Sequence, residues 1–379
     1  MEDTANIRLP NKWDSHAEEN IHEHRGVLVS VGLAALVLLW IVNWMSVLPL
    51  VRDSHLQSAQ DFSIFYTGSR IVWSGLSAHL YDLSVQAQYQ TAPYRLQPLP
   101  FNHPAYELIL FLPLAKLSFN SAYWAWTALN VVMTLVIAYL LSRHLPYFPR
   151  SPGVGAWSFV AAMASFPLIW ALCQGQDSIL LLLIFVLVYL NLKSGKEATA
   201  GIILATGLFK FTLIVPFAVV FLLRGRWRFL AGFLGGSALV AGISIWITGI
   251  GGAYQYIQLL SLLAGHPSVG YINPLLMPDA RGFLLTILAG SGVHRQGFEV
   301  ISAAVSILLL VVPFLTFRSQ KPCDRFDLWF GLNLTVALVV SPHLYWHDLS
   351  VLLLPLLLVA NLLAKTGIRT AWMWAAVIA

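Results

Sequence analysis

Charged residues are scarce in this sequence. Asp, Glu, Lys and Arg make up only 10% of the 379 residues, whereas 58% are hydrophobic and the mean hydropathy is +0.72. An ordinary soluble domain carries about 25% charged residues. It could not bury this much apolar surface, because much of any folded surface stays exposed. The scarcity of charge therefore excludes an ordinary soluble protein and predicts that lipid is the solvent for much of the chain.

Cysteine is nearly absent as well. Cys173 and Cys323 fall in loops expected on opposite faces of the membrane, so no disulfide between them is expected. The chain also lacks a Cys/His spacing typical of zinc sites and an outward Asp-x-Asp, so we expect no metal and no cofactor. We expect no cleavable signal peptide either, because residues 1–26 are polar and the apolar run after them is longer than an h-region.

Long apolar runs predict membrane-spanning helices, because about 20 helical residues cross a bilayer core of roughly 30 Å. Such runs cover residues 27–50, 120–141, 154–172, 178–192, 229–250, 298–317, 326–340 and 349–363. Segments 106–117 and 281–290 are too short to cross, and the first suits an interfacial or re-entrant helix. Segment 198–223 has Lys210 and Pro216 at its middle, which favours a broken hairpin.

The organisation that follows is an all-α polytopic membrane protein. Residues 1–26 are expected to be a cytoplasmic N-terminal segment, and 27–379 a single membrane domain. Residues 51–105 form a long first extracytoplasmic loop with interfacial helices. An apolar run from near Ala371 to Ala379 is expected to be a last span that is cut off.

Basic residues indicate the orientation. With the N-terminus inside, most of the 22 Lys and Arg residues fall in short inside loops, as the positive-inside rule requires. These loops explain the formal charge of +5 without a nucleic-acid partner. The polar clusters at 51–105, 174–177, 251–280 and 341–348 then lie outside. We expect a protein of the cell's inner (plasma) membrane with its chemistry on the extracytoplasmic side.

Asp61 opens an aromatic run, 61–66, directly after a stretch of loop. One interpretation is that it caps a helix lying in the membrane interface. The other is a carboxylate base at the membrane surface, where partial burial tunes its acidity. The residues alone leave both open.

Lys210 is the residue whose placement inside the membrane is expected to cost the most free energy. It lies about 18 Å along a helix from the cytoplasmic loop, too deep to reach back to that side. A lysine at this depth either forms a structural ion pair or supplies a point charge for a phosphate. His343 and His347 could bind an anion near a helix N-terminus or, at i, i+4 spacing, a metal, whereas Asp348 could simply cap that helix.

Five ordered stretches together resemble glycosyltransferase family 87, the polyprenol-phosphate-mannose-dependent mannosyltransferases of bacterial membranes, within the GT-C superfamily. They are Asp61–Tyr66, Phe101–Pro104 leading into Leu108–Leu117, Gly175-Gln176, Gly207–Lys210 with Pro216 and Arg224–Arg228, and Ser341–His343 with His347-Asp348 and Pro355. Their order and spacing run from about residue 60 to 360. Two stretches depart from the family pattern, which often has Pro-Pro at 103–104 and His-His at 347–348. Both fall in the expected donor region, so the donor or the sugar can differ.

The resemblance implies a GT-C-like bundle of about 10–12 transmembrane helices. It also implies inverting transfer of a hexose, mannose in the family, from a polyprenyl-phosphate donor to a glycan or glycolipid acceptor outside the membrane. Asp61 matches the family's general base. Positive charge is needed at the leaving phosphate, and the candidates are Lys210, Arg281, His343 and His347. The expected substrate-binding residues are Tyr66, Asn102, His103, Gln174, Gln176 and Asp348.

Two other functions fit parts of the pattern. A secondary transporter or lipid-linked sugar flippase would place charges on broken helices at the midplane, as Lys210 and Pro216 suggest. The clustering of polar residues on one face and the long first loop favour transfer instead. A purely structural membrane protein would leave those polar clusters unexplained.

Overall fold

The computed structural model describes ten stretches of the chain, which are residues 34, 37–45, 47–49, 52–53, 60–90, 99–145, 165–270, 273–288, 294–316 and 323–365. These residues contain helices and connecting turns and no β-strand, so the all-α prediction is confirmed. The main helices are α3 Phe62–Trp73, α4 Leu83–Tyr89, α5 Phe119–His144, α7 Phe166–Gln174, α8 Ser178–Lys193, α9 Glu197–Ala205, α10 Phe211–Leu223, α11 Trp227–Gly265, α12 Ala280–Leu288, α13 Arg295–Leu315, α14 Cys323–Val340 and α15 Leu353–Lys365. Short 3-10 helices connect them, namely η1 Ser77–His79, η2 Ala105–Leu110, η3 Leu112–Lys116, η4 Leu208–Lys210, η5 Pro267–Gly270, η6 Pro274–Leu276 and η7 Trp346–Leu352.

Three described helices are long and apolar enough to cross a membrane: α5, α11 and α13. The pair formed by α9 and α10 is a fourth candidate, bent by 67° at its break. The described helices that could cross a membrane are therefore fewer than the spans expected from the sequence. Several expected spans are shorter helices, such as α8. The expected span 154–172 lies largely outside the described residues, and the expected span 27–50 is described only in part.

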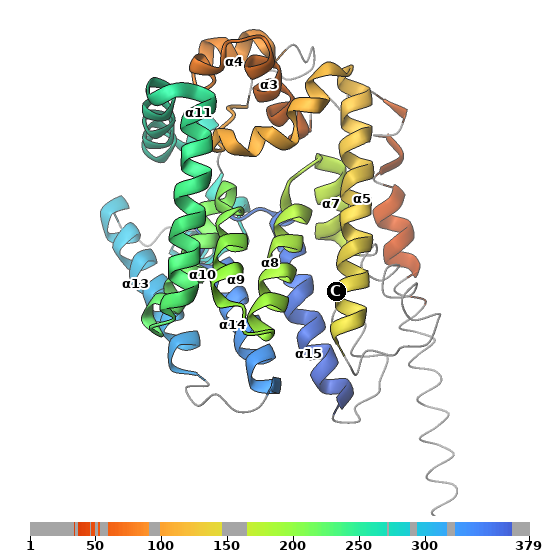
Figure 1. Ribbon diagram of the computed structural model, residues 1–379, viewed down its shortest axis with the longest axis vertical. Coiled ribbons are helices and arrows are strands. Elements are labelled where there is room, and N and C mark those ends of the chain that lie inside the picture. Colours follow the sequence, from red (N-terminus) through yellow and green to blue (C-terminus); the bar gives the residue numbers. More distant parts are fainter. Residues whose placement is uncertain are drawn as a thin grey trace, which may run out of the picture.

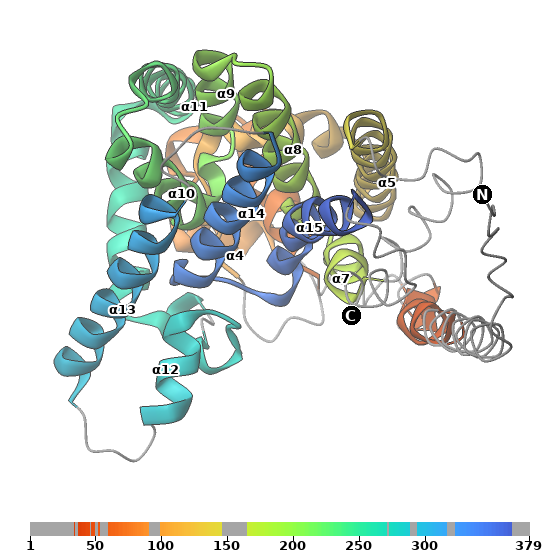
Figure 2. The same ribbon diagram turned by 90° about the horizontal axis from the view of Figure 1, so that it is seen from below.

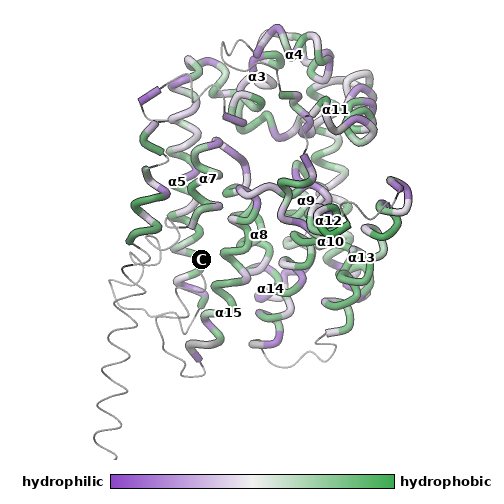
Figure 3. Tube along the Cα trace, turned by 180° about the vertical axis from the view of Figure 1, so that it is seen from behind, coloured by the Kyte–Doolittle hydropathy of each residue, from purple (hydrophilic) through white to green (hydrophobic). Residues whose placement is uncertain are grey.

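The helices form a bundle with a layer across one end (Figure 1). Helices α5, α8, α10, α14 and α15 run along the long axis. Helices α3, α4 and the last part of α11 lie over the upper end of this group, and α5 extends up to the level of α3. From below, α14 stands between α15 and α13, with which it packs (Figure 2). Hydrophobic residues follow the long helices, whereas hydrophilic residues gather in the upper layer and just beneath it (Figure 3).

Segment 197–226 folds back on itself, in agreement with the broken hairpin that the sequence predicts for residues 198–223. Arg226 Nη1 lies 2.8 Å from Glu197 Oε1, so the two ends of the segment meet on one side of the bundle. The helix breaks at Thr206-Gly207, and η4 carries Lys210 next to the break.

Helices α9 and α11 cross with their backbones nearly in contact. A Cβ atom on Gly232 would lie 2.0 Å from the carbonyl oxygen of Ala198, and one on Gly201 would lie 2.1 Å from that of Phe229. Small residues allow this approach, which is the usual way in which membrane helices pack tightly.

Helix α11 differs from the prediction, which ended a span at residue 250 and placed a loop at 251–280. The chain kinks at Gly249, whose φ of 72° and ψ of 171° suit glycine, and then continues as a helix to Gly265. Leu259 and Leu263 are buried in this second part, and the Tyr256 ring lies 4.8 Å from that of Tyr81. The apolar residues thus hold the segment against the upper layer in Figure 1.

Candidate active site

Asp61 lies at the N-terminus of α3, but its side chain does not cap that helix. The backbone of Asp61 is already helical, and its carboxylate makes no hydrogen bond to the first-turn amides. Instead, Gln176 Nε2 donates a hydrogen bond of 2.7 Å to Asp61 Oδ2. The geometry therefore excludes the interpretation that the Asp61 side chain caps the helix.

The turn between α7 and α8 brings Gln176 to Asp61. Gly175 ends α7 in the left-handed conformation, with φ 63° and ψ 38°. A Cβ atom there would lie 2.6 Å from Phe62 Cβ, so glycine also permits the close approach to α3. Trp126 Nε1 donates to the Gly175 carbonyl at 2.9 Å and fixes the turn to α5.

Lys210 lies in a buried ion network rather than alone. Its Nζ atom is 3.0 Å from Asp348 Oδ1 and 3.3 Å from Asp177 Oδ1. Ser178 Oγ donates to Asp348 Oδ1 at 2.8 Å, and the Tyr345 amide donates to Asp348 Oδ2 at 3.2 Å. The structure therefore agrees with the ion-pair interpretation of Lys210. Asp348 holds Lys210 and also the start of η7.

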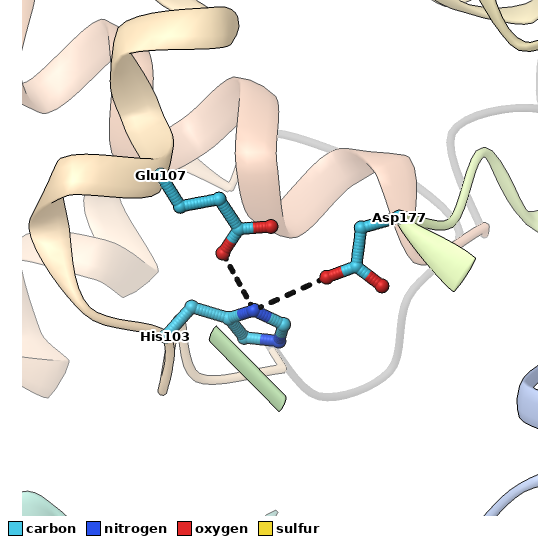
Figure 4. Close-up of side chains that lie close together, drawn as sticks. All are labelled: His103, Glu107 and Asp177. Atoms are coloured by element: carbon cyan, nitrogen blue, oxygen red, sulfur yellow. Dashed lines mark hydrogen bonds and ion pairs between the residues drawn. The ribbon is translucent and has the colours of Figure 1, made fainter. Parts of the chain in front are cut away.

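His103 extends the network on the other side of Asp177. Its Nδ1 atom lies 2.7 Å from Glu107 Oε2 and 3.4 Å from Asp177 Oδ2 (Figure 4). Both carboxylates are fully buried. Burial raises the pKa of Glu107 well above its usual range, against the lowering effect of His103, and the Asp177 carboxylate adds to the rise. Burial opposes protonation of His103, but Glu107 and Asp177 outweigh it and raise the His103 pKa.

Sequence reasoning missed Glu107 and Asp177. Glu107 lies inside an apolar stretch, and Asp177 directly precedes the apolar run at 178–192. Burying a carboxylate without a partner costs free energy. An acidic residue within or next to an apolar segment therefore indicates that a partner lies nearby in the fold, and this was the signal available in the sequence.

Two cavities border this network, and His103 and Lys210 line both of them. The first, of about 300 Å³, is lined by Asp61, Ile64, Leu99, Pro100, Asn102, His103, Trp170, Gln174, Gln176, Lys210, Gly270, His343, Tyr345, Trp346 and His347. The second, of about 520 Å³, is lined by Asn102, His103, Phe209, Lys210, Phe211, Thr212, Leu260, Leu263, Ala264, Arg281, Glu299, Pro342 and His343. Asn102, His103, Lys210 and His343 border both cavities.

Most of the predicted site residues come together here. Asp61, Gln174, Gln176 and His347 line the first cavity, whereas Arg281 lines the second. Arg281 Nη2 is paired with Glu299 Oε1 at 2.7 Å.

Tyr66 is placed elsewhere and lines neither cavity. Its hydroxyl donates to the Leu117 carbonyl at 2.8 Å, and its ring packs edge-on against Phe119. In the structure Tyr66 therefore joins α3 to the start of α5.

His343 is neutral at neutral pH. Burial lowers the pKa of its imidazole to about 4, and the positive charge of Lys210 lowers it further. The neighbouring Asp348 carboxylate works in the opposite direction. A neutral imidazole at the border of both cavities can accept or donate a hydrogen bond, and an anion beside it would favour the protonated form.

The comparisons with known proteins identify the family. The model of glycosyltransferase family 87 matches residues 101–342, which is more than half of the chain. No curated protein and no solved structure matched the chain significantly. The match includes His103, Asp177, Lys210 and Arg281, whereas Asp61 precedes it. His347 and Asp348 follow the matched range, so their assignment to the site rests on the geometry above. The chain belongs to glycosyltransferase family 87 and is a glycosyltransferase.

Proposed function

We propose that this glycosyltransferase moves a hexose, with mannose as the first candidate, from a polyprenyl-phosphate donor to a glycan or glycolipid acceptor, with inversion at the anomeric carbon. The observation that carries the proposal is the junction of two cavities of different chemistry. One contains the Asp61 carboxylate, and the other contains Arg281 beside apolar walls. Lys210 and His343 border both.

Asp61 is the proposed general base. An acceptor hydroxyl in the first cavity attacks the anomeric carbon and gives its proton to the Asp61 carboxylate. The new bond forms between the acceptor oxygen and the anomeric carbon as the bond from that carbon to the phosphate oxygen breaks. Attack from the face opposite the leaving phosphate inverts the configuration. The rings of Trp170, Tyr345 and Trp346 line the same cavity and suit the apolar faces of sugar rings.

The second cavity is the proposed donor site. The phosphate leaves with the electron pair and carries its own negative charge, so it needs nearby cations rather than a carboxylic acid. Arg281 offers a planar guanidinium suited to phosphate, and it exchanges its partner Glu299 for the donor. Leu260, Leu263 and Phe211 give the prenyl chain an apolar wall. Lys210 stays held by Asp177 and Asp348 and acts from the floor of the cavity.

The proposed active site faces the extracytoplasmic side of the cell's inner membrane. The support is the distribution of basic residues and the Glu197–Arg226 pair, which lies at the opposite, basic end of the α9–α10 segment. Family membership favours transfer over the transporter or flippase considered from the sequence.

The test is a transfer assay with the purified full chain in lipid nanodiscs. Radiolabelled polyprenyl-phosphate mannose and polyprenyl-phosphate glucose are offered separately with glycolipids extracted from membranes. We expect a labelled product with one of them and none with the Asp61→Asn variant. Transfer from a nucleotide sugar, with none from either lipid donor, would refute the proposed donor class.

A further inference from the structure

We propose that His103, Glu107 and Asp177 bind a divalent transition-metal ion at the junction of the two cavities. From the sequence we expected no metal, because the chain has neither a Cys/His spacing typical of zinc sites nor an outward Asp-x-Asp. The fold brings one atom of each residue within 4.8 Å of the others. This inference does not depend on the identity of donor or acceptor.

The distance from His103 to Asp177 suits two ligands of one ion, whereas His103 and Glu107 are in direct hydrogen-bond contact. His103 Nδ1 is 3.4 Å from Asp177 Oδ2 and 2.7 Å from Glu107 Oε2. Two atoms that are each about 2.1 Å from a zinc ion lie roughly 3.4 Å apart in a tetrahedral site. Figure 4 shows the two carboxylates converging on the same edge of the imidazole ring. A small rotation of the Glu107 side chain would open room for an ion between them.

Unsatisfied carboxylate oxygens are an independent sign of a missing ligand. Glu107 Oε1 and both oxygens of Asp177 are buried and accept no hydrogen bond from the described part of the chain. The contacts of Asp177 are the longer ion pairs to His103 and Lys210 and, when Glu107 carries a proton, a hydrogen bond from its carboxyl group. Buried carboxylate oxygens normally have partners, because leaving one without any costs about 1–3 kcal/mol or more.

The charge count points to a cation. Glu107, Asp177 and Asp348 are three buried carboxylates. Among the described residues, the cations that contact them are Lys210 and, when protonated, His103 and His347. A divalent ion beside Glu107 and Asp177 would remove the excess negative charge. Protons on Glu107 and His103 would remove part of it as well, so the experiment has to separate bound protons from a bound metal ion.

The donor set selects the class of metal. An imidazole with two carboxylates suits Zn²⁺ or Mn²⁺ better than Ca²⁺ or Mg²⁺, which prefer oxygen ligands alone. Three protein ligands leave a coordination position open in a tetrahedral site. His103 lines both cavities, so the cluster can be reached from them.

The backbone around His103 is held in place before any ion binds. The Phe101 amide donates to Gln86 Oε1 at 2.7 Å, and Gln86 Nε2 donates to the Leu80 carbonyl at 2.8 Å. The Tyr81 hydroxyl donates to the His103 carbonyl at 3.0 Å. These bonds fix the backbone before and at His103 and limit the rearrangement that binding requires.

The experiment uses the tag-free full chain in nanodiscs, stripped with a chelator and dialysed. Zn²⁺ and Mn²⁺ are added separately, and bound metal is measured by equilibrium dialysis with mass spectrometry, together with the melting temperature. We expect one ion per chain and a higher melting temperature with at least one metal. His103→Ala and Glu107→Gln should weaken binding by at least about tenfold, since even groups that only orient a ligand matter this much. His79→Ala removes an exposed imidazole on η1 and should bind like wild type.

Several outcomes would overturn the proposal. One is that neither metal binds in a stoichiometric amount. Another is that His103→Ala and Glu107→Gln bind the metal as tightly as wild type does. If a variant fails to fold, X-ray absorption of the metal-loaded wild type decides instead. A shell of nitrogen and oxygen ligands with one imidazole supports the site, and a shell without imidazole refutes it. A proton alone at Glu107 would appear as no bound metal in wild type.

Discussion

Gln176 Nε2 donates a hydrogen bond of 2.7 Å to Asp61 Oδ2, joining the turn after α7 to the first residue before α3. The two residues are 115 positions apart in the sequence. Gln176 is buried, and its donor fixes the direction of the carboxylate within the first cavity. This contact holds the Asp61 carboxylate in a fixed position in the cavity, and the carboxylate does not cap α3.

Asp61→Asn should reduce sugar transfer by about 10²–10⁴-fold, because the amide keeps the shape but cannot take the proton. Donor binding and melting temperature should stay near wild type. Asp82→Asn is the matched control, since Asp82 is a carboxylate that caps α4 through the Ser84 amide, and asparagine also caps. More than about a tenth of wild-type turnover in Asp61→Asn would assign the base to another residue.

Lys210→Met should destabilise the protein by roughly 3–5 kcal/mol, because Asp177 and Asp348 would remain buried without their cation. Adding Asp348→Asn removes one of these charges and should restore part of the lost stability. Thermal or denaturant unfolding of the three proteins in the same detergent measures both effects. If the double variant is less stable than Lys210→Met, the unpaired charge of Asp348 is not the cause of the lost stability.

Donor affinity should increase as the pH falls towards the pKa of His343 in the free protein. The pKa of His343 lies near 4 in the free protein because of burial and the charge of Lys210, and a bound phosphate would raise it. Between these two pKa values binding takes up a proton, so affinity rises by up to about tenfold per pH unit as the pH falls. A polyprenyl-phosphate sugar is a phosphodiester and keeps one charge over this range.

The measurement is the donor dissociation constant between about pH 7.5 and 5.5, for wild type and His343→Asn. The variant should show a flatter dependence. His103, His347 and Asp348 also face His343 electrostatically. An equal slope in both proteins would therefore assign the proton uptake to another group of this cluster.

Gly232→Ala should destabilise the packing of α9 against α11 by about 1–3 kcal/mol, because the added methyl would collide with the Ala198 carbonyl. Gly235→Ala places the same methyl in open space on the same helix and should be neutral or slightly stabilising. Melting temperatures of the two variants, compared with wild type, check the difference. Equal effects would mean that the close crossing does not limit stability.

Single cysteines should report the orientation, after Cys173 and Cys323 are replaced by serine. Ala78→Cys lies exposed on η1 in the upper layer and should react with an impermeant thiol reagent in intact cells. Ser194→Cys lies exposed in the turn after α8 and should react only after the membrane is permeabilised. The opposite labelling pattern would reverse the proposed sidedness of the active site.

The sequence alone determined the fold class and the kind of environment. A chain with few charges and long apolar runs has to be helical in lipid, because every backbone group in a bilayer core needs an internal partner. Lys210 and Pro216 in the middle of an apolar segment predicted its break. The ordered motifs indicated glycosyltransferase family 87, and the family match confirmed it.

Only the tertiary structure decided what each polar residue contacts. A hydrophobic pattern specifies which face of a helix is buried, but not which distant side chain lies opposite a carboxylate. Gln176 meets Asp61 because Gly175 allows two helices to approach closely. Asp177 meets His103 and Lys210 because the turn before α8, the loop before η2 and the break before α10 converge at one depth. Such pairings come from packing over the whole chain, and local sequence does not encode them.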